Sequence, residues 1–326
     1  MHPAFSVIFL TTLIGAGQGL FLALFTADVY AELGLLPHPE GRFFAIGCAL
    51  ALVLMGLGLV ASFFHLGRPE RGWRAAACWR TSWLSREVIV LPAFMGALLL
   101  YGAGHCFGIT GTLFTVSGTL RVDWTLIFGS VAALLCFLLF LCTGMVYACL
   151  KFLREWATPL TPVNYLLLGS ASGFTLATAY AAAADSPLAG FFGGWAIIIT
   201  VLGFATRGAA LGRNRRLRPV STLQTAIGVR HPRIAQKAQG AMGGSFNTRE
   251  FFHGRPAGVV ARVQWTFLAL AFAAPVALLA LGLAGSGVPP LLWAAFAIQY
   301  AGLLAERWHF FAQARHPQNL YYQSVS

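Results

Sequence analysis

The chain has 326 residues, of which 58% are hydrophobic and only 10% are charged. Soluble domains carry about 25% charged residues, so this composition excludes a soluble multidomain protein and predicts one that crosses a membrane several times. The formal net charge is +12. In a membrane protein such an excess indicates anionic lipid headgroups or an acidic subunit as partners, and we expect no nucleic acid.

Eight apolar segments are long enough to cross the hydrocarbon core, which takes about 20 residues of helix. The chain is therefore predicted to be an all-α integral membrane protein, an eight transmembrane helix bundle that forms a single membrane-anchor domain over residues 1–326. The fifth, sixth and seventh segments are rich in Ala and Gly, which indicates closely packed helices. The predicted spans are 5–30, 43–65, 87–107, 123–150, 162–184, 190–211, 259–283 and 288–311.

An even number of spans puts both termini on one side of the membrane, here called side X. Loops 66–86, 151–161 and 212–258 lie on the same side, and the opposite side is called side Y. Of the 22 Lys and Arg residues, only Arg42 and Arg121 fall on side Y. The positive-inside rule then makes side X, with both termini, cytoplasmic, although a basic face would also fit an acidic docking partner.

The loop 212–258 between the sixth and seventh spans is unusually long and basic. A loop of this length is usually functional or disordered, and its mixed Thr, Gln, Phe and Gly content argues against disorder. We therefore expect a folded cytoplasmic cap over side X, with a flexible basic tether as the alternative. The residues predicted to dock a partner are Arg74, Arg213, Arg215, Arg230, Arg249 and Arg255.

The segment 65–87, between the second and third spans, gathers groups that a bilayer normally excludes. It holds five arginines, one histidine, two glutamates and three tryptophans. Ionisable groups collected at a membrane edge indicate a functional site. The candidates are a quinone headgroup site, a docking surface for a charged partner, or both.

His65 ends the second span and Glu87 begins the third, both on side X. We expect them at similar depth, because one loop connects the two helices. Quinone reduction takes two electrons and two protons, so His65 is the candidate proton donor and Glu87 the candidate relay. The alternatives are that His65 caps the C-terminal end of its helix and that Glu87 pairs with Arg86 or Arg80.

A wider set of side chains is predicted to surround the quinone. For its arginines the alternative is ordinary positive-inside bias, and for its tryptophans ordinary enrichment at the membrane interface. The predicted quinone-binding residues are His65, Arg68, Arg71, Trp73, Arg80, Trp83, Ser85 and Glu87. Second-rank candidates for a proton path or quinone wall are Glu306, Arg307, His309, Asn164 and Tyr165, while Asp28 is expected at the side Y interface.

The sequence does not indicate a metal or haem bound by this chain. None of the six cysteines forms a CxxC pair, which metal sites commonly use. The histidines at span edges are His65, His105 and His309, and no histidine lies in the middle of a span, so we expect no haem. Electrons for a quinone must then come from a redox partner outside the chain.

The runs HLGRPERGWR at 65–74 and RTSWLSRE at 80–87 resemble the DmsC family, the membrane-anchor subunits of dimethyl sulfoxide reductase-type complexes. Residues 221–232, 243–254 and 312–322 match the same family. The resemblance implies an anchor without haem that exchanges electrons with ubiquinone or menaquinone as an exchangeable substrate. It also implies a four-cluster iron–sulfur subunit and a molybdopterin catalytic subunit as partners, and quinone roles for His65 and Glu87.

Members of this family differ in orientation and in the direction of electron flow. A cytoplasmic side X favours the branch whose soluble subunits oxidise sulfite in the cytoplasm and whose anchor, in the bacterial inner membrane, passes the electrons to quinone. The alternative is the menaquinol-oxidising anchor of a dimethyl sulfoxide or other S-oxide reductase. Further alternatives are an anchor without quinone chemistry and a secondary transporter, although transporters usually carry polar groups or broken helices in mid-membrane.

Overall fold

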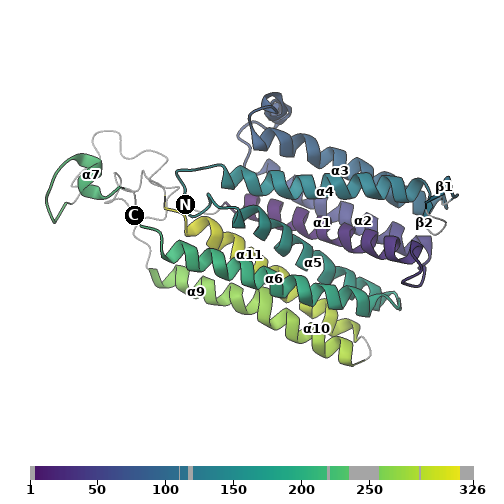
Figure 1. The fold of residues 1–326 in the computed structure, drawn as a ribbon. Coiled ribbons are helices and arrows are strands. Elements are labelled where there is room, and N and C mark those ends of the chain that lie inside the picture. The colour runs from purple at the N-terminus through teal and green to yellow at the C-terminus, as the bar shows by residue number, and fades with distance from the viewer. Residues whose placement is uncertain are drawn as a thin grey trace.

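The computed structural model describes residues 4–109, 111–116, 120–218, 221–234, 257–285 and 288–315. Long helices run roughly side by side and form a bundle (Figure 1). They are α1 (Phe5–Glu32), α2 (Gly41–Phe63), α3 (Trp83–Cys106), α4 (Trp124–Ala148), α5 (Leu160–Ala183), α6 (Ala189–Arg215), α9 (Ala257–Leu268), α10 (Ala274–Ala284) and α11 (Pro289–Ala312). The π-helical turn η2 (Ala269–Ala273) joins α9 to α10.

Among the described residues, seven helices are long and apolar enough to cross a membrane. They are α1 to α6 and the continuous stretch through α9, η2 and α10, and they coincide with the first seven predicted spans to within a few residues at each end. The helix α11 covers the eighth predicted span but is not one of these seven, and it contains the polar residues Gln299, Glu306 and Arg307. The all-helical membrane architecture is thus confirmed, whereas the count of eight spans stays a prediction.

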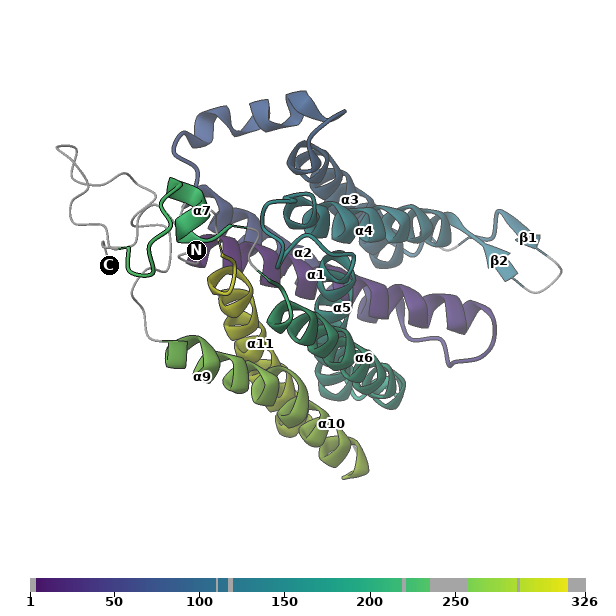
Figure 2. The ribbon, with the colours of Figure 1, turned by 60° about the vertical axis from the view of Figure 1, so that its left-hand side comes forward.

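The two ends of the bundle carry different loops. The first residue of α1 and the last of α11 lie at one end, and the hairpin of β1 (Phe114–Val116) and β2 (Leu120–Val122) lies at the other (Figure 1). The 3₁₀ helix η1 (Pro69–Cys78) packs beside the X end of α3, at the end that holds the termini of the bundle (Figure 2). This arrangement agrees with the predicted division into sides X and Y.

The centre of the bundle is the contact between α1 and α5. Most of both helices is buried, and their backbones meet at glycines: a Cβ on Gly173 would lie 2.0 Å from the carbonyl carbon of Gly19. The prediction of close packing from small residues is confirmed for α5. The helix α6 also packs closely along α5, although only a minority of its own residues are buried.

The seventh span contains a proline and stays helical. Pro275 lacks the N–H that would bond one turn earlier, and the π-helical turn η2 lies just before it. The neighbouring α11 approaches this turn closely, because a Cβ on Gly302 would lie 2.3 Å from the amide nitrogen of Ala271. The irregular turn is therefore covered by another helix, as a bilayer requires.

The predicted cap loop 212–258 is described only in part. Residues 212–215 belong to α6, and the short helix α7 (Leu223–Ile227) begins at a capping box made by Thr222 and Thr225. Residues 219–220 and 235–256 lie outside the described residues. The folded cap therefore stays a prediction.

Candidate functional site

Glu87 lies inside α3 and not at its first residue. The helix begins four residues earlier, because the Ser82 hydroxyl accepts a hydrogen bond from the Ser85 amide at 3.3 Å and caps the helix. The Glu87 carboxyl is partly buried and accepts a hydrogen bond from the Thr143 hydroxyl of α4 at 2.6 Å. The carboxyl group is thus turned into the bundle.

The alternative ion pair of Glu87 with Arg86 or Arg80 is wrong. Within the described part of the chain, the Arg86 guanidinium instead donates to the backbone oxygens of Trp79 and Arg80, at 2.9 and 2.8 Å. Arg86 also lies over the Trp83 ring, with Cζ 4.3 Å from the ring centroid. Arg86 therefore closes the start of α3, and Glu87 forms no ion pair with any residue that the structure describes.

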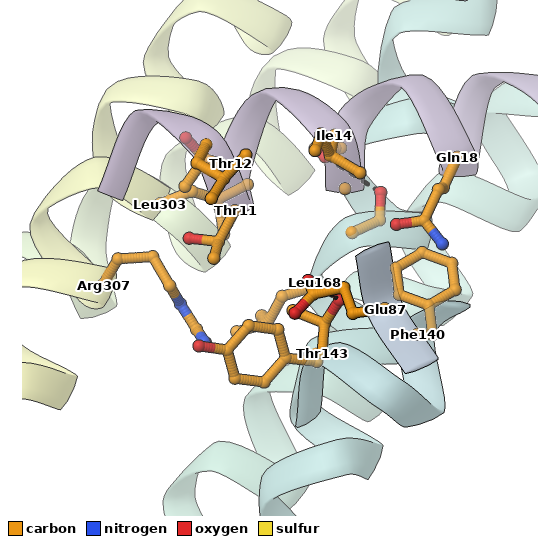
Figure 3. A pocket seen from close by; sticks show the side chains of 15 residues that line it. Thr11, Thr12, Ile14, Gln18, Glu87, Phe140, Thr143, Leu168, Leu303 and Arg307 are labelled. Atoms are coloured by element: carbon orange, nitrogen blue, oxygen red, sulfur yellow. Dashed lines mark hydrogen bonds between the residues drawn. The ribbon is translucent and has the colours of Figure 1, made fainter. Parts of the chain in front are cut away.

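Glu87 and Thr143 line a cavity of about 30 Å³ between α1, α3, α4, α5 and α11. A cavity of this size holds one or two water molecules and is far smaller than a pocket for an organic ligand. Figure 3 shows Glu87 entering from one side and Arg307 of α11 from the opposite side. The other polar lining residues are Thr11, Thr12, Gln18, Tyr165 and Ser172.

His65 lies outside this cavity. It follows the last residue of α2 by two positions, and its side chain is largely exposed. Desolvation of the part of the ring that neighbouring atoms cover lowers its pKa below the usual range. Its ring makes no hydrogen bond or ion pair with another described residue, and it does not line the cavity with Glu87. The structure therefore does not bring the predicted donor and relay into contact, and their pairing stays a prediction.

The other predicted quinone residues divide into an exposed group and an inner group. The exposed group is on or beside η1, where Arg71 Nε lies 3.8 Å from a carboxylate oxygen of Glu70. The inner group is at the start of α3, where Ser85 is buried and Trp83 is partly buried. The exposed residues are Arg68, Arg71, Trp73 and Arg80.

The predicted docking residues occupy different environments. Arg74, Arg215 and Arg230 are exposed. The Arg213 guanidinium instead donates to the backbone oxygen of Arg154 at 3.0 Å and so ties α6 to the loop after α4. The remaining two, Arg249 and Arg255, lie outside the described residues.

A buried charged cluster lies next to this cavity, and the sequence ranked its members low. Glu306 is fully buried, and its two carboxylate oxygens lie 2.6 Å from Nε of Arg207 on α6 and 2.6 Å from Nε of Arg307. Arg307 also stacks on Tyr165, with Cζ 4.1 Å from the ring centroid. The available sequence signal was Arg207 itself, a charge within an otherwise apolar span.

The polar group at the Y end is more deeply buried than expected. Asp28 accepts a hydrogen bond from the Tyr101 hydroxyl at 3.0 Å, and its Oδ2 lies 3.4 Å from Nε2 of His105. The His105 ring stacks on Phe44, with centroids 4.6 Å apart. Helix packing thus shields the Asp28 side chain at the Y end, and its placement at the membrane interface stays a prediction.

No group of three metal-ligating side chains occurs among the described residues. His105 and His309 lie in the last turns of α3 and α11, which end on opposite sides of the bundle. Whether the chain binds haem or a metal stays a prediction.

Comparison with known proteins identifies the family to which this chain belongs. The family model "DMSO reductase anchor subunit (DmsC)" matches residues 1–232. The sulfite dehydrogenase C subunit of Allochromatium vinosum is 58% identical over 327 residues, covering 100% of both chains. The chain belongs to the DmsC family. As a DmsC-type protein it is a multi-pass membrane-anchor subunit of an oxidoreductase complex and has partner subunits in that complex.

A weaker similarity concerns transporters. The "Uncharacterized MFS-type transporter YhhS" of Salmonella typhimurium is 29% identical over 136 residues, which cover 34% of this chain and 32% of the transporter. The same match occurs with the protein of that name from Salmonella typhi. So short a match does not extend the DmsC affiliation to transport.

Proposed function

We propose that this chain is the quinone-reactive membrane anchor of a heterotrimeric complex of the bacterial inner membrane. A molybdopterin subunit and a four-cluster iron–sulfur subunit oxidise sulfite in the cytoplasm, and the anchor passes the two electrons to ubiquinone or menaquinone. The observation that carries this proposal is the full-length similarity to a protein named as part of a sulfite dehydrogenase. A partly buried carboxyl group at the X end of the bundle, Glu87, supports the quinone chemistry.

Reduction of one quinone consumes two electrons from the iron–sulfur partner and two protons, and gives one quinol. Glu87 suits the transfer of these protons, because its carboxyl group contacts a neutral hydroxyl and a cavity with room for water. The cavity is too small for the quinone ring, so the ring binds outside it, at the membrane edge near η1. The exposed arginines there, including Arg68 and Arg71, attract an acidic partner surface and stabilise negative charge on the ring.

The reverse direction has one observation in its favour. The description of the matching family refers to dimethyl sulfoxide reductase. The anchor of such a reductase would oxidise menaquinol, and the electrons would reduce an S-oxide. The same residues would then release protons from the quinol to side X. The two directions differ in the compartment that side X faces, which gives a direct way to separate them.

The test uses membranes that contain the chain with its partner subunits. We expect sulfite-dependent reduction of a short-chain quinone, and we expect Glu87→Gln and His65→Ala each to lower it by about a hundredfold or more. Sulfite-dependent reduction of a soluble dye by the partner subunits should persist, which shows that the complex has assembled. The control is Glu40→Gln, which changes an exposed carboxyl at the Y end of α2.

Two results would contradict the proposal. Wild-type membranes that reduce the dye with sulfite but never reduce quinone would leave the chain as an anchor without quinone chemistry. Full quinone turnover in both variants would remove Glu87 and His65 from the reaction.

A further inference from the structure

A second small cavity lies directly beside the one that contains Glu87. It has a volume of about 10 Å³, which is close to the space that one water molecule needs. Tyr165 and Arg307 line both cavities and form the boundary between them. The second cavity is lined by Glu155, Thr158, Thr161, Asn164, Tyr165, Arg207, Ala210, Glu306, Arg307 and Phe310.

Two buried nitrogen atoms at this boundary lack a hydrogen-bond partner among the described residues. They are Nη2 of Arg207 and Nη1 of Arg307, and both side chains are at least nine-tenths buried. Buried polar groups in proteins are nearly always hydrogen-bonded, either to the protein or to ordered water. These two atoms therefore indicate water molecules within and between the two cavities.

The second cavity reaches toward side X. Glu155 belongs to the loop between α4 and α5, which is on that side, and its side chain is partly exposed. Thr158 and Thr161 follow it along the wall of the cavity. A polar series thus leads from solvent on side X to Glu87. It passes through the second cavity, the boundary at Tyr165 and the first cavity.

The charges along this series favour proton uptake at its inner end. If all five side chains are ionised, the series carries one more negative charge than positive charges. The three carboxylates are those of Glu87, Glu155 and Glu306, and the two guanidinium groups are those of Arg207 and Arg307. Glu306 is held by a guanidinium at each oxygen, so it stays ionised and does not trap a proton. Among the described residues, the one hydrogen-bond partner of the Glu87 carboxyl is the neutral Thr143 hydroxyl, so Glu87 is the carboxylate best able to accept the proton.

Other titratable side chains face the same cluster. Tyr147 of α4 stacks on Tyr165 with centroids 5.6 Å apart, and His309 of α11 packs on Phe267 with centroids 5.2 Å apart. Neither lines either of the two cavities, so neither is part of the series.

We propose that the protons for quinone reduction are taken up from side X through these two cavities, past the Arg207–Glu306–Arg307 cluster, and delivered to Glu87. For each quinone, two protons travel this way and meet two electrons from the iron–sulfur partner. This inference rests on the proposed function. Tyr165 and Arg307 act as positioning residues that hold the water between the cavities.

The cluster could also serve only to fasten α6 to α11, so the test must remove water without breaking an ion pair. Ala210 is buried and lines the second cavity, and Ala210→Val adds two carbon atoms to that space. The adjacent Ala209 is exposed on the same helix, so Ala209→Val is the matched control.

We expect Ala210→Val to lower sulfite-dependent quinone reduction about tenfold, with the larger loss at alkaline pH, where free protons are scarcer. Dye reduction by the partner subunits should be unchanged, and a membrane-permeant weak acid such as acetic acid should restore quinone turnover. If turnover fell because the ion pairs between α6 and α11 were broken, the weak acid would not restore it. Ala209→Val should behave as the wild type.

A second variant covers the case in which Ala210→Val fails to assemble. Glu155→Gln changes a partly exposed side chain at the outer end and is expected to give a smaller loss that acetic acid again restores. Quinone turnover equal to wild type in both variants, or a loss that acetic acid does not restore, would overturn the inference. A wild-type complex that reduces the dye but not quinone would instead overturn the proposed function.

Discussion

At the scale of single residues, Glu306 is the most consequential buried charge in the described part of the chain. It compensates the guanidinium groups of Arg207 and Arg307, which lie 2.6 Å from its oxygens and have almost no contact with solvent. Removing one partner from such a group leaves uncompensated charge in a low-dielectric interior, which costs far more than the pair contributed.

Glu306→Gln should therefore lower the free energy of unfolding by about 3–5 kcal/mol. The measurement is the temperature at which buried thiols react with a fluorescent maleimide in detergent, since Cys48, Cys136 and Cys142 are buried and free. The control is Glu40→Gln, whose carboxyl is exposed and forms no ion pair within the described part of the chain. Equal transition temperatures for the two variants would show that the cluster is not a stabilising element.

The sequence predicted one half of the candidate site better than the other. The sequence alone identified Glu87, because an acidic residue at the edge of an apolar span stands out before the fold is known. The pairing of Arg207 with Glu306 depends on how α6 and α11 pack around α5, and no local pattern encodes that contact. For the same reason the sequence could not show that His65 lies outside the cavity of Glu87.

At the scale of helices, the close contact of α1 with α5 depends on glycines, which have no side chain to hold the two backbones apart. Gly173→Ala would put a Cβ 2.0 Å from the carbonyl carbon of Gly19, so the two helices would have to separate. We expect the free energy of unfolding to fall by about 1–3 kcal/mol, measured by the same thiol reaction. In α2, a Cβ on Gly56 would meet no neighbouring atom within 4 Å, so Gly56→Ala should be neutral or slightly stabilising. Equal effects of the two substitutions would contradict close packing of α1 against α5.

The positions of the helices were predictable because the bilayer imposes them. A backbone segment in hydrocarbon must satisfy its own hydrogen bonds, so a long apolar run implies a helix. The ends were less predictable, since outside the hydrocarbon core a helix can continue through charged residues. The cap at Ser82 starts α3 before the apolar run, and α6 continues through Arg215.

At the scale of the whole molecule, the buried carboxyl groups of the described residues lie toward the two ends of the bundle, with Glu306 at the X end and Asp28 and Asp123 at the Y end. Gln18 borders the cavity near Glu87, and Asp28 lies further along α1 at the Y end. Between them the rings of Phe21 and Phe25 pack against Tyr101, with centroids 5.8 and 6.0 Å apart. These rings separate Gln18 from Asp28 along α1, which supports proton uptake from side X.

The side that faces the cytoplasm then decides where these protons come from. Among the Lys and Arg residues that the structure describes, only Arg42 and Arg121 lie at the Y end, at the start of α2 and in β2. Because basic loops are retained in the cytoplasm, a reporter fused after Ser326 should show activity in the cytoplasm and none in the periplasm. The control is a fusion truncated at residue 36, in the loop on side Y, which should give the opposite pattern. A periplasmic signal after Ser326 would make the proton source periplasmic and favour an S-oxide reductase that draws electrons from menaquinol.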